Sequence, residues 1–335
     1  MDNITHSLTG ALAAKIIETN GQRAEQEQKT HRTLFWLTVI CANLPDIDAL
    51  MNIFGDPFFI IKHHRGLTHS LLFAPVLAFL PAITAYLVTS VKNLKLLWMM
   101  ALVGIYLHIF FDVITTFGTQ LFAPLSAERY SLDWMFIIDP LFTLIVALLL
   151  FLGKRASAHQ RGFALAGGIF VVSYLLVEMV SHQIAVQRMA TVARQQGLAV
   201  EKVSALPQPL SIFRWMGLVQ TNDAVYRAFF NVFGNPEPSE LTKFPQASDP
   251  FVEQAMKTEE AAWFMKFARH PWIRSVEQGR HWVVEIHDMQ FSFDPELAST
   301  VGDAIGIAEV DRRPPFVLRF TYTSEGTLQS VEFNR

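Results

Sequence analysis

The sequence has few of the features that define several common classes of protein. It contains one cysteine in 335 residues, so a scaffold held by internal disulfides is excluded. Charged residues make up only 17%, against about 25% in an ordinary soluble domain. The net charge of -3 argues against a nucleic-acid-binding protein, and the hydrophobic content of 51% excludes a disordered chain. No glycine-rich phosphate loop, nucleophile elbow or Cys-x-x-Cys pair is present.

The apolar residues are concentrated in long runs. Four stretches, at 67–89, 96–118, 135–153 and 162–181, each contain at most one Asp, Glu, Lys or Arg. A helix needs about 20 mostly apolar residues to cross the hydrocarbon core, so each run predicts a transmembrane helix. Two shorter apolar stretches, 7–17 and 34–44, could form a further hairpin of crossings or re-enter. The sequence therefore predicts about four to six membrane helices.

The composition changes near residue 182. Charged residues and prolines return, and a helix is expected over 253–268. Strands are expected over 282–293 and 316–333, the second broken by a turn at 324–326. We predict a mainly α protein, with a helical membrane bundle over 1–182 and a small soluble α+β domain over 183–335.

The basic residues indicate an orientation. The loops 18–33, 90–95 and 154–161 together hold eight Lys and Arg, whereas the alternate loops 49–66 and 119–134 hold three. Lys and Arg are enriched in cytoplasmic loops, so the first set is expected in the cytoplasm. With six crossings, the N-terminus, the second set and the C-terminal domain would be extracytoplasmic.

The polar residues left in or beside the apolar runs are nearly all His or Asp, the residue types that bind zinc, manganese or iron. His108 and Asp112 are four residues apart and share a helix face. An ionisable residue inside a membrane helix normally has a partner or a ligand. The orientation above places all the candidates on the extracytoplasmic side: His6, Asp46, Asp48, His63, His64, His69, His108 and Asp112. One metal site on that side is therefore expected.

Several spaced motifs carry a family resemblance. They are Thr-His near the N-terminus, Pro-Asp-x-Asp, His-Arg-Gly-x-Thr-His-Ser and a later His-x-x-x-Asp. Over roughly residues 1–155 the chain resembles the membrane-bound, metal-dependent hydrolases of the bacterial inner membrane. The ligand pattern alone is also remotely similar to that of zinc-dependent phospholipases C.

The resemblance implies roles for individual residues. The implied metal ligands are His6, Asp46, His64, His69, His108 and Asp112, and His63 has the weakest case. Either Asp48 or His64 would be a ligand and the other would orient a ligating imidazole. Arg65 would hold a phosphate, because its planar fork matches phosphate oxygens; an interfacial anchor is the alternative. The implied cofactor is a divalent metal, zinc first, with one or two ions; manganese and iron remain open.

Together these features predict a metal-dependent hydrolase that cleaves a phosphoester of a lipid or another amphiphile. Membrane lipid is the expected partner and nucleic acid is not. Two alternatives stay open: a non-catalytic metal-binding, transporting or sensing protein, and a partner-binding protein whose C-terminal domain carries the function. The sequence does not determine the oligomeric state.

Overall fold

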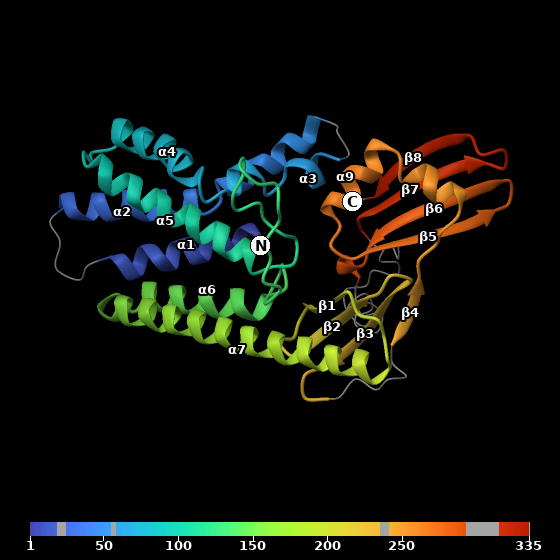
Figure 1. Cartoon of the computed structure of the whole chain (residues 1–335). Helices are drawn as coiled ribbons and strands as arrows, with labels where there is room; N and C mark the ends of the chain where they lie inside the picture. Colours follow the sequence, from blue (N-terminus) through green and yellow to red (C-terminus); the bar gives the residue numbers. More distant parts are fainter. Residues whose placement is uncertain (19–24, 55–57, 235–240, 293–314, 335) are drawn as a thin grey trace. The chain divides into compact units, whose positions relative to one another are not determined.

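The computed structural model describes residues 1–18, 25–54, 58–234, 241–292 and 315–334 (Figure 1). The chain divides into two compact units. The first comprises Met1–Phe54 and His63–Met179, and the second comprises Gly55–Lys62 and Val180–Arg335. Each unit is described separately below.

The first unit is helical. Its helices are α1 (Asn3–Ile17), α2 (Glu25–Cys41), α4 (Ala74–Val88), α5 (Leu94–Val113), α6 (Pro140–Arg155) and the first part of α7 (Gln160–Gln195). The short helical turns η1 (Pro45–Phe54), η2 (Leu67–His69) and η3 (Ser157–His159) lie between them. Helix α3 (Phe59–His63) spans the sequence boundary between the two units.

Helices α1, α2 and α5 approach one another closely because small residues lie where they meet. A Cβ atom at Gly104 of α5 would lie 2.5 Å from the carbonyl oxygen of Thr38 in α2. One at Gly10 of α1 would lie 2.8 Å from Cβ of Ala42. The buried face of α5 includes Leu97, Ala101, Gly104, Ile105, His108 and Asp112. The spacing of three and four residues that packs α5 into the unit therefore also turns His108 and Asp112 inward.

The predicted number of membrane helices is too high. Among the described residues, two helices are long and apolar enough to cross a membrane, Leu94–Val113 and Gln160–Gln195. A third is possible if Phe59–His69 and Ala74–Val88, bent by 72° at their junction, form one span. The other predicted segments form helices that are too short: α1 has 15 residues and α2 has 17. The run from 135 becomes helical only at Pro140, and 16 residues cover about 24 Å of a core about 30 Å thick.

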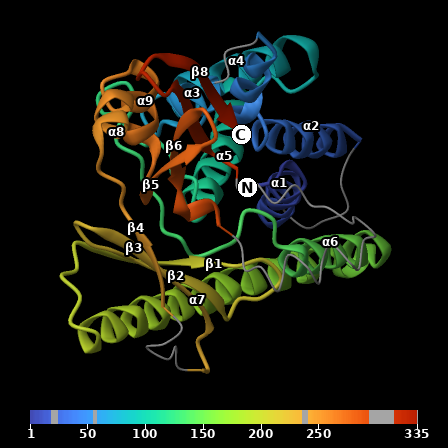
Figure 2. The same cartoon turned by 90° about the vertical axis from the view of Figure 1, so that its right-hand side faces the viewer.

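The second unit contains two antiparallel sheets of four strands. The first has the order β1 (Lys202–Pro207), β2 (Arg214–Gln220), β3 (Ala224–Asn231) and β4 (Thr242–Pro245). The second has the order β5 (Pro271–Gln278), β6 (His281–Asp288), β7 (Val317–Thr323) and β8 (Leu328–Asn334). The first sheet packs against the C-terminal part of α7, where Met189 and Ala193 share a core with Trp215 (Figure 2).

The α+β character predicted for this region agrees with the structure, but details differ. The helix predicted over 253–268 is two helices, α8 (Pro250–Ala255) and α9 (Glu259–Phe267), because the Thr258 hydroxyl caps a new helix start. The predicted hairpin turn is present, with Gly326 at a φ of 87° between β7 and β8. The strand predicted over 282–293 is too long: β6 ends at Asp288 and the helical turn η5 (Met289–Phe291) follows, while Phe293 lies outside the described residues. Strands β1 to β5 were not predicted.

The close approach of α2 and α5 predicts opposite effects for one substitution at two glycines. Gly104→Ala should destabilise the protein by about 1–3 kcal/mol, because the new methyl group meets backbone that cannot move cheaply. Gly162→Ala in α7 should be neutral or stabilising, since nothing beyond its chain neighbours and its own helix backbone lies within 4 Å of the position its methyl group would take, and alanine favours helix. Thermal unfolding of both variants in detergent, against the parent chain, measures the difference. Equal unfolding temperatures for the two variants would contradict the packing.

Candidate metal centre

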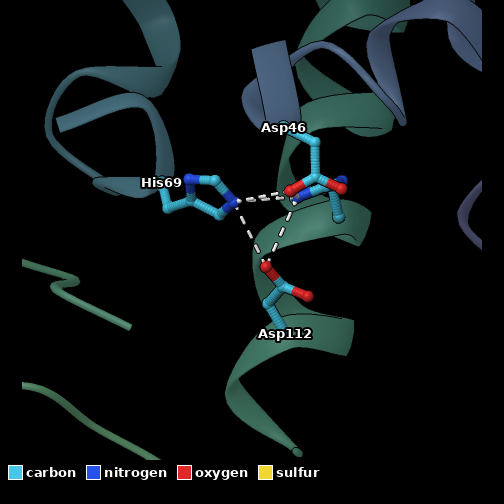
Figure 3. A group of neighbouring side chains, drawn as sticks. Asp46, His69 and Asp112 are labelled. Carbon is cyan, nitrogen blue, oxygen red and sulfur yellow. Dashed lines mark hydrogen bonds and ion pairs between the residues drawn. The ribbon is translucent and has the colours of Figure 1, made fainter. Parts of the chain in front are cut away.

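The candidate ligands lie at ends of helices and helical turns that are close together in the first unit. Asp46 and Asp48 lie in η1, just after the C-terminal end of α2, and His69 ends η2, just before α4. His108 and Asp112 lie in the last two turns of α5. Figure 3 shows the carboxylates of Asp46 and Asp112 and the imidazole of His69 pointing at one another. Residues far apart in the sequence therefore meet at one place.

Four donor atoms from these residues form a compact group. They belong to Asp46, His69, His108 and Asp112, and they all lie within 4.8 Å of one another. His69 Nε2 lies 3.4 Å from Asp46 Oδ1 and 3.2 Å from Asp112 Oδ2. His108 Nε2 lies 3.4 Å from each of the same two oxygens, and the two Nε2 atoms are 3.0 Å apart. His69, His108 and Asp112 are fully buried, and the Asp46 side chain is 14% exposed.

The contacts of Nδ1 in His69 and His108 indicate which nitrogen of each ring carries the hydrogen. His108 Nδ1 lies 2.8 Å from the carbonyl oxygen of Ala42, which can only accept a hydrogen bond, so Nδ1 carries the hydrogen. Thr68 Oγ1 donates to Asp48 Oδ2 over 2.6 Å and can then accept from His69 Nδ1, 3.0 Å away. In the neutral rings, both Nε2 atoms therefore present lone pairs to the group. This arrangement is typical of histidines that bind metals.

The distances fit a tetrahedral metal ion. Zinc binds nitrogen and oxygen at about 2.0–2.2 Å, so neighbouring ligands in a tetrahedron are about 3.3–3.6 Å apart. Four of the five measured separations are 3.2–3.4 Å, longer than charge-assisted hydrogen bonds of about 2.7–2.9 Å. Asp112 Oδ2 is also buried without a hydrogen-bond partner. Two lone pairs and two carboxylate oxygens at this spacing favour a cation among them.

Asp48 and His64 form a second group with Asp46 that has different geometry. His64 Nδ1 lies 2.7 Å from Asp48 Oδ1, which is a hydrogen-bond distance and too short for two ligands of one ion. Asp48 Oδ2 accepts from Thr68 and lies 3.4 Å from His69 Nδ1. Asp48 thus contacts two imidazoles and a hydroxyl, and these contacts suit a carboxylate that orients His69.

The Arg65 side chain is buried and pairs with Asp112. Its side chain is 3% exposed; Nη2 lies 2.9 Å from Asp112 Oδ1, and Nη1 donates to Thr115 Oγ1 over 2.9 Å. Arg65 has a φ of 57°, a left-handed conformation that costs a non-glycine residue about 1–3 kcal/mol and is concentrated at functional sites. The surroundings therefore hold Arg65 against Asp112, with its guanidinium 5.1 Å from the Phe117 ring.

Arg129, in the connection between α5 and α6, contacts the segment that carries Arg65. Arg129 donates to the carbonyl oxygens of Gly118 and His64, over 3.2 and 3.1 Å. Burial and the neighbouring Arg65 guanidinium lower the pKa of Arg129 to about 10. Asp139, a polar residue at the start of an apolar run, caps α6 by accepting from the Phe142 amide over 2.9 Å.

His6 and His63, the remaining candidates, lie in different surroundings. The His6 ring stacks on His108 with centroids 3.8 Å apart, and its Nε2 lies 3.4 Å from Asp112 Oδ1. It is fully buried, but it is outside the groups of donor atoms found among the described residues. The α-amino group of Met1 also contacts Asp112 Oδ1. His63 is exposed and belongs to neither group.

The carboxylates of η1 are held in their ionised form. Burial acts to raise the pKa of Asp46, but the neighbouring imidazoles of His108 and His69, when protonated, outweigh it and keep the pKa well below its usual range. Asp48 has the same balance, with hydrogen bonds from His64 and His69 opposing the effect of burial on its pKa. Both side chains are therefore acceptors at neutral pH, as metal ligands and their orienting partners must be.

Sequence reasoning missed the contacts made by the backbone. The carbonyl oxygen of Ala42, which sets the tautomer of His108, follows from the end of α2 and has no signature in residue types. The orientation of Arg65 toward Asp112 depends on a left-handed backbone that the sequence offers no means to predict. The structure brings six of the predicted ligands into one region, and four of them offer atoms to the compact group: His6, His64, His69, His108, Asp46 and Asp112 lie there, and His6 and His64 are outside the group.

Apolar helices and a buried His/Asp group together define a membrane protein with a candidate metal site. The comparison with protein families is more specific: the chain belongs to the YdjM inner membrane protein family, whose model matches residues 1–185. The match contains every residue of the candidate metal centre.

Two relatives show significant similarity to the chain. The chain is 28% identical over 183 residues to the uncharacterized protein YfhP of Bacillus subtilis, covering 54% of each chain. It is 32% identical over 108 residues to the inner membrane protein YbcI of Escherichia coli, covering 31% of this chain and 61% of the relative. The chain thus matches little more than half the length of these relatives. No solved structure gives a significant match.

The four-donor group predicts that His108→Ala strongly weakens metal binding. Removing one of four donors should weaken metal affinity by more than about 100-fold, since even outer partners of ligands are worth 10–100-fold. Metal content of the purified full-length protein and competition with a chelator measure the loss. The matched control is His63→Ala, whose exposed ring lies outside the group and whose loss should leave metal binding intact. Equal metal content in the two variants would show that the donor group is wrongly assigned.

Asp48 has a distinguishable role, which a second substitution tests. Asp48→Asn should retain the metal but weaken its binding about 10–100-fold, because His69 loses its charged partner. Asp133→Asn is the control, a buried carboxylate outside both groups whose left-handed backbone asparagine tolerates. A complete loss of metal in Asp48→Asn would instead make Asp48 a ligand.

Proposed function

We propose that this protein is a metal-dependent hydrolase of the inner membrane that cleaves a phosphoester of a lipid. The observation that carries the proposal is the set of four donor atoms from Asp46, His69, His108 and Asp112 at the spacing of a tetrahedral metal ion. The mixture of two imidazoles and two carboxylates suits zinc, and it also accommodates manganese or iron. The resemblance to membrane-bound hydrolases supports the reaction class.

The residues around the donor set have separate tasks in this proposal. A bound divalent metal supplies Lewis acidity toward a phosphoryl oxygen and lowers the pKa of a water molecule. Asp48 holds His69 in the tautomer that presents Nε2, and Ala42 does the same for His108. Arg65 holds Asp112 in place. To clamp a phosphate directly, Arg65 would have to leave Asp112 and Thr115, so its contacts favour the positioning role.

The position in the membrane suggests the substrate. Asp112 lies next to the last residue of α5, a candidate membrane span at Leu94–Val113, so the donor set lies near one end of that span. An amphiphile that keeps its head group at the interface can reach such a site laterally. Lys92 and Lys95 lie at the start of α5, and basic residues favour the cytoplasmic side, which supports an extracytoplasmic location for the site at the other end of this helix.

A non-catalytic metal-binding protein is the second candidate, and one observation favours it. Catalytic zinc sites usually have three protein ligands and leave a position for water, whereas sites with four protein ligands are usually structural. Here four donors are available. Asp46 is the most exposed of them and is the ligand that substrate or water would replace in the hydrolase.

The proposal predicts phosphoester hydrolysis that depends on the metal. Full-length protein in vesicles of phosphatidylethanolamine and phosphatidylglycerol should release phosphate-containing head groups, lose activity in chelator and regain it with zinc. Asp112→Asn should lower the rate by about 1,000-fold, the loss of several kcal/mol of transition-state stabilisation. Asp133→Asn serves as the control and should retain activity. Stoichiometric zinc with no hydrolysis of any lipid phosphoester would favour the non-catalytic candidate.

A further inference from the structure

The segments that carry the metal donors also expose large apolar side chains. Ile47, between Asp46 and Asp48, is 52% exposed, and Leu50 is 60% exposed. Leu67, two residues before the fully buried His69, is 46% exposed. Asp48 and His69 are buried whereas Ile47, Leu50 and Leu67 are exposed, which is the reverse of a segment exposed to water.

Further apolar side chains are held beside these segments. The Leu71 amide donates to the carbonyl oxygen of Leu121 over 2.9 Å, and Ser70 Oγ donates to that of Ala123 over 2.6 Å. These bonds bring Leu71 next to the loop of Phe122 and Leu125, which are 41% and 83% exposed. We call the resulting set the apolar rim: Ile47, Leu50, Leu67, Leu71, Phe122 and Leu125.

The apolar rim continues the exposed apolar surface of a candidate membrane span. Tyr106 of α5 donates its hydroxyl to the Leu71 carbonyl oxygen over 3.4 Å. Tyr106 and Phe110 of the same helix are 37% and 41% exposed. In the sequence, 67–91 contains no Asp, Glu, Lys or Arg, and 111–127 contains only Asp112, which is buried. The exposed Glu128 directly follows this range, and its carboxylate accepts from Tyr130, which packs on Phe122. An apolar surface that continues a membrane span and is bordered by one charge fits the hydrocarbon edge of a leaflet; a surface for a protein partner normally has a polar rim on all sides.

We propose that the apolar rim inserts into the hydrocarbon edge of the leaflet, and that the acyl chain of a membrane lipid lies against it. This proposal rests on the proposed function for the identity of the head group, which is a phosphoester that reaches the four donors. It defines the substrate class as lipids with acyl chains, in preference to water-soluble phosphoesters. Insertion itself does not depend on hydrolysis and is tested separately.

The insertion test uses the single cysteine of the chain. Cys41 is fully buried, so a fluorophore attached at Leu125→Cys labels one exposed position of the full-length protein. In vesicles of phosphatidylethanolamine and phosphatidylglycerol that contain no other protein, lipids with nitroxide groups on their acyl chains should quench this fluorophore strongly. The control is Glu27→Cys, in the charged first turn of α2, which those lipids should leave unquenched. Equal, weak quenching at both positions would overturn the proposal, because the apolar rim would then not reach the acyl chains.

The substrate test uses Leu125→Asn. Loss of one large apolar contact should lower the rate on the vesicle lipid about tenfold and leave the rate on the soluble ester bis(p-nitrophenyl) phosphate unchanged within about twofold. Equal losses on both substrates would overturn the acyl-chain contact. If the parent chain hydrolyses neither substrate while Leu125→Cys is quenched, the proposed function fails and the insertion of the rim stands.

Discussion

The burial of Asp112 at the end of α5 is the constraint on which the candidate metal centre depends. A carboxylate with no exposed surface is unstable unless charges and hydrogen bonds compensate for the lost water. Arg65 and the Met1 amine contact one of its oxygens, while the other faces two imidazole nitrogens and has no hydrogen-bond partner. A bound cation beside this second oxygen would balance the part of the negative charge of Asp112 that the protein's own groups leave uncompensated.

The fold of the first unit supplies this arrangement through the lengths and directions of its helices. The same face of α5 that packs through Leu97, Ala101 and Gly104 ends in His108 and Asp112. Helix α2 reaches the site at its C-terminal end, so Ala42 provides a carbonyl oxygen and η1 provides two carboxylates. The close contact at Gly104 keeps α2 and α5 near enough for these groups to meet. The contact between α2 and α5 therefore both packs the unit and brings the donor residues together.

Some of this could be predicted from residue types and some could not. His and Asp are conspicuous in a chain with few charges, so the residues that meet at Asp112 could be found by their positions beside the apolar runs. The number of membrane helices could not be predicted, because hydropathy does not reveal that Pro140 starts a helix of only 16 residues. Strands such as β2, with Trp215, Met216, Leu218 and Val219 all buried, lack the alternation that predicts a strand. The role of Arg65 depends on its backbone angle, which no spacing encodes.

The central claim is that Asp46, His69, His108 and Asp112 bind one metal ion together. X-ray absorption at the zinc edge of full-length protein purified with zinc tests it most directly. The account predicts one equivalent of zinc with four nitrogen or oxygen ligands at about 2.0–2.1 Å and the outer-shell scattering of two imidazoles. A folded protein that binds no metal, or zinc surrounded by six oxygens without imidazole, would contradict it.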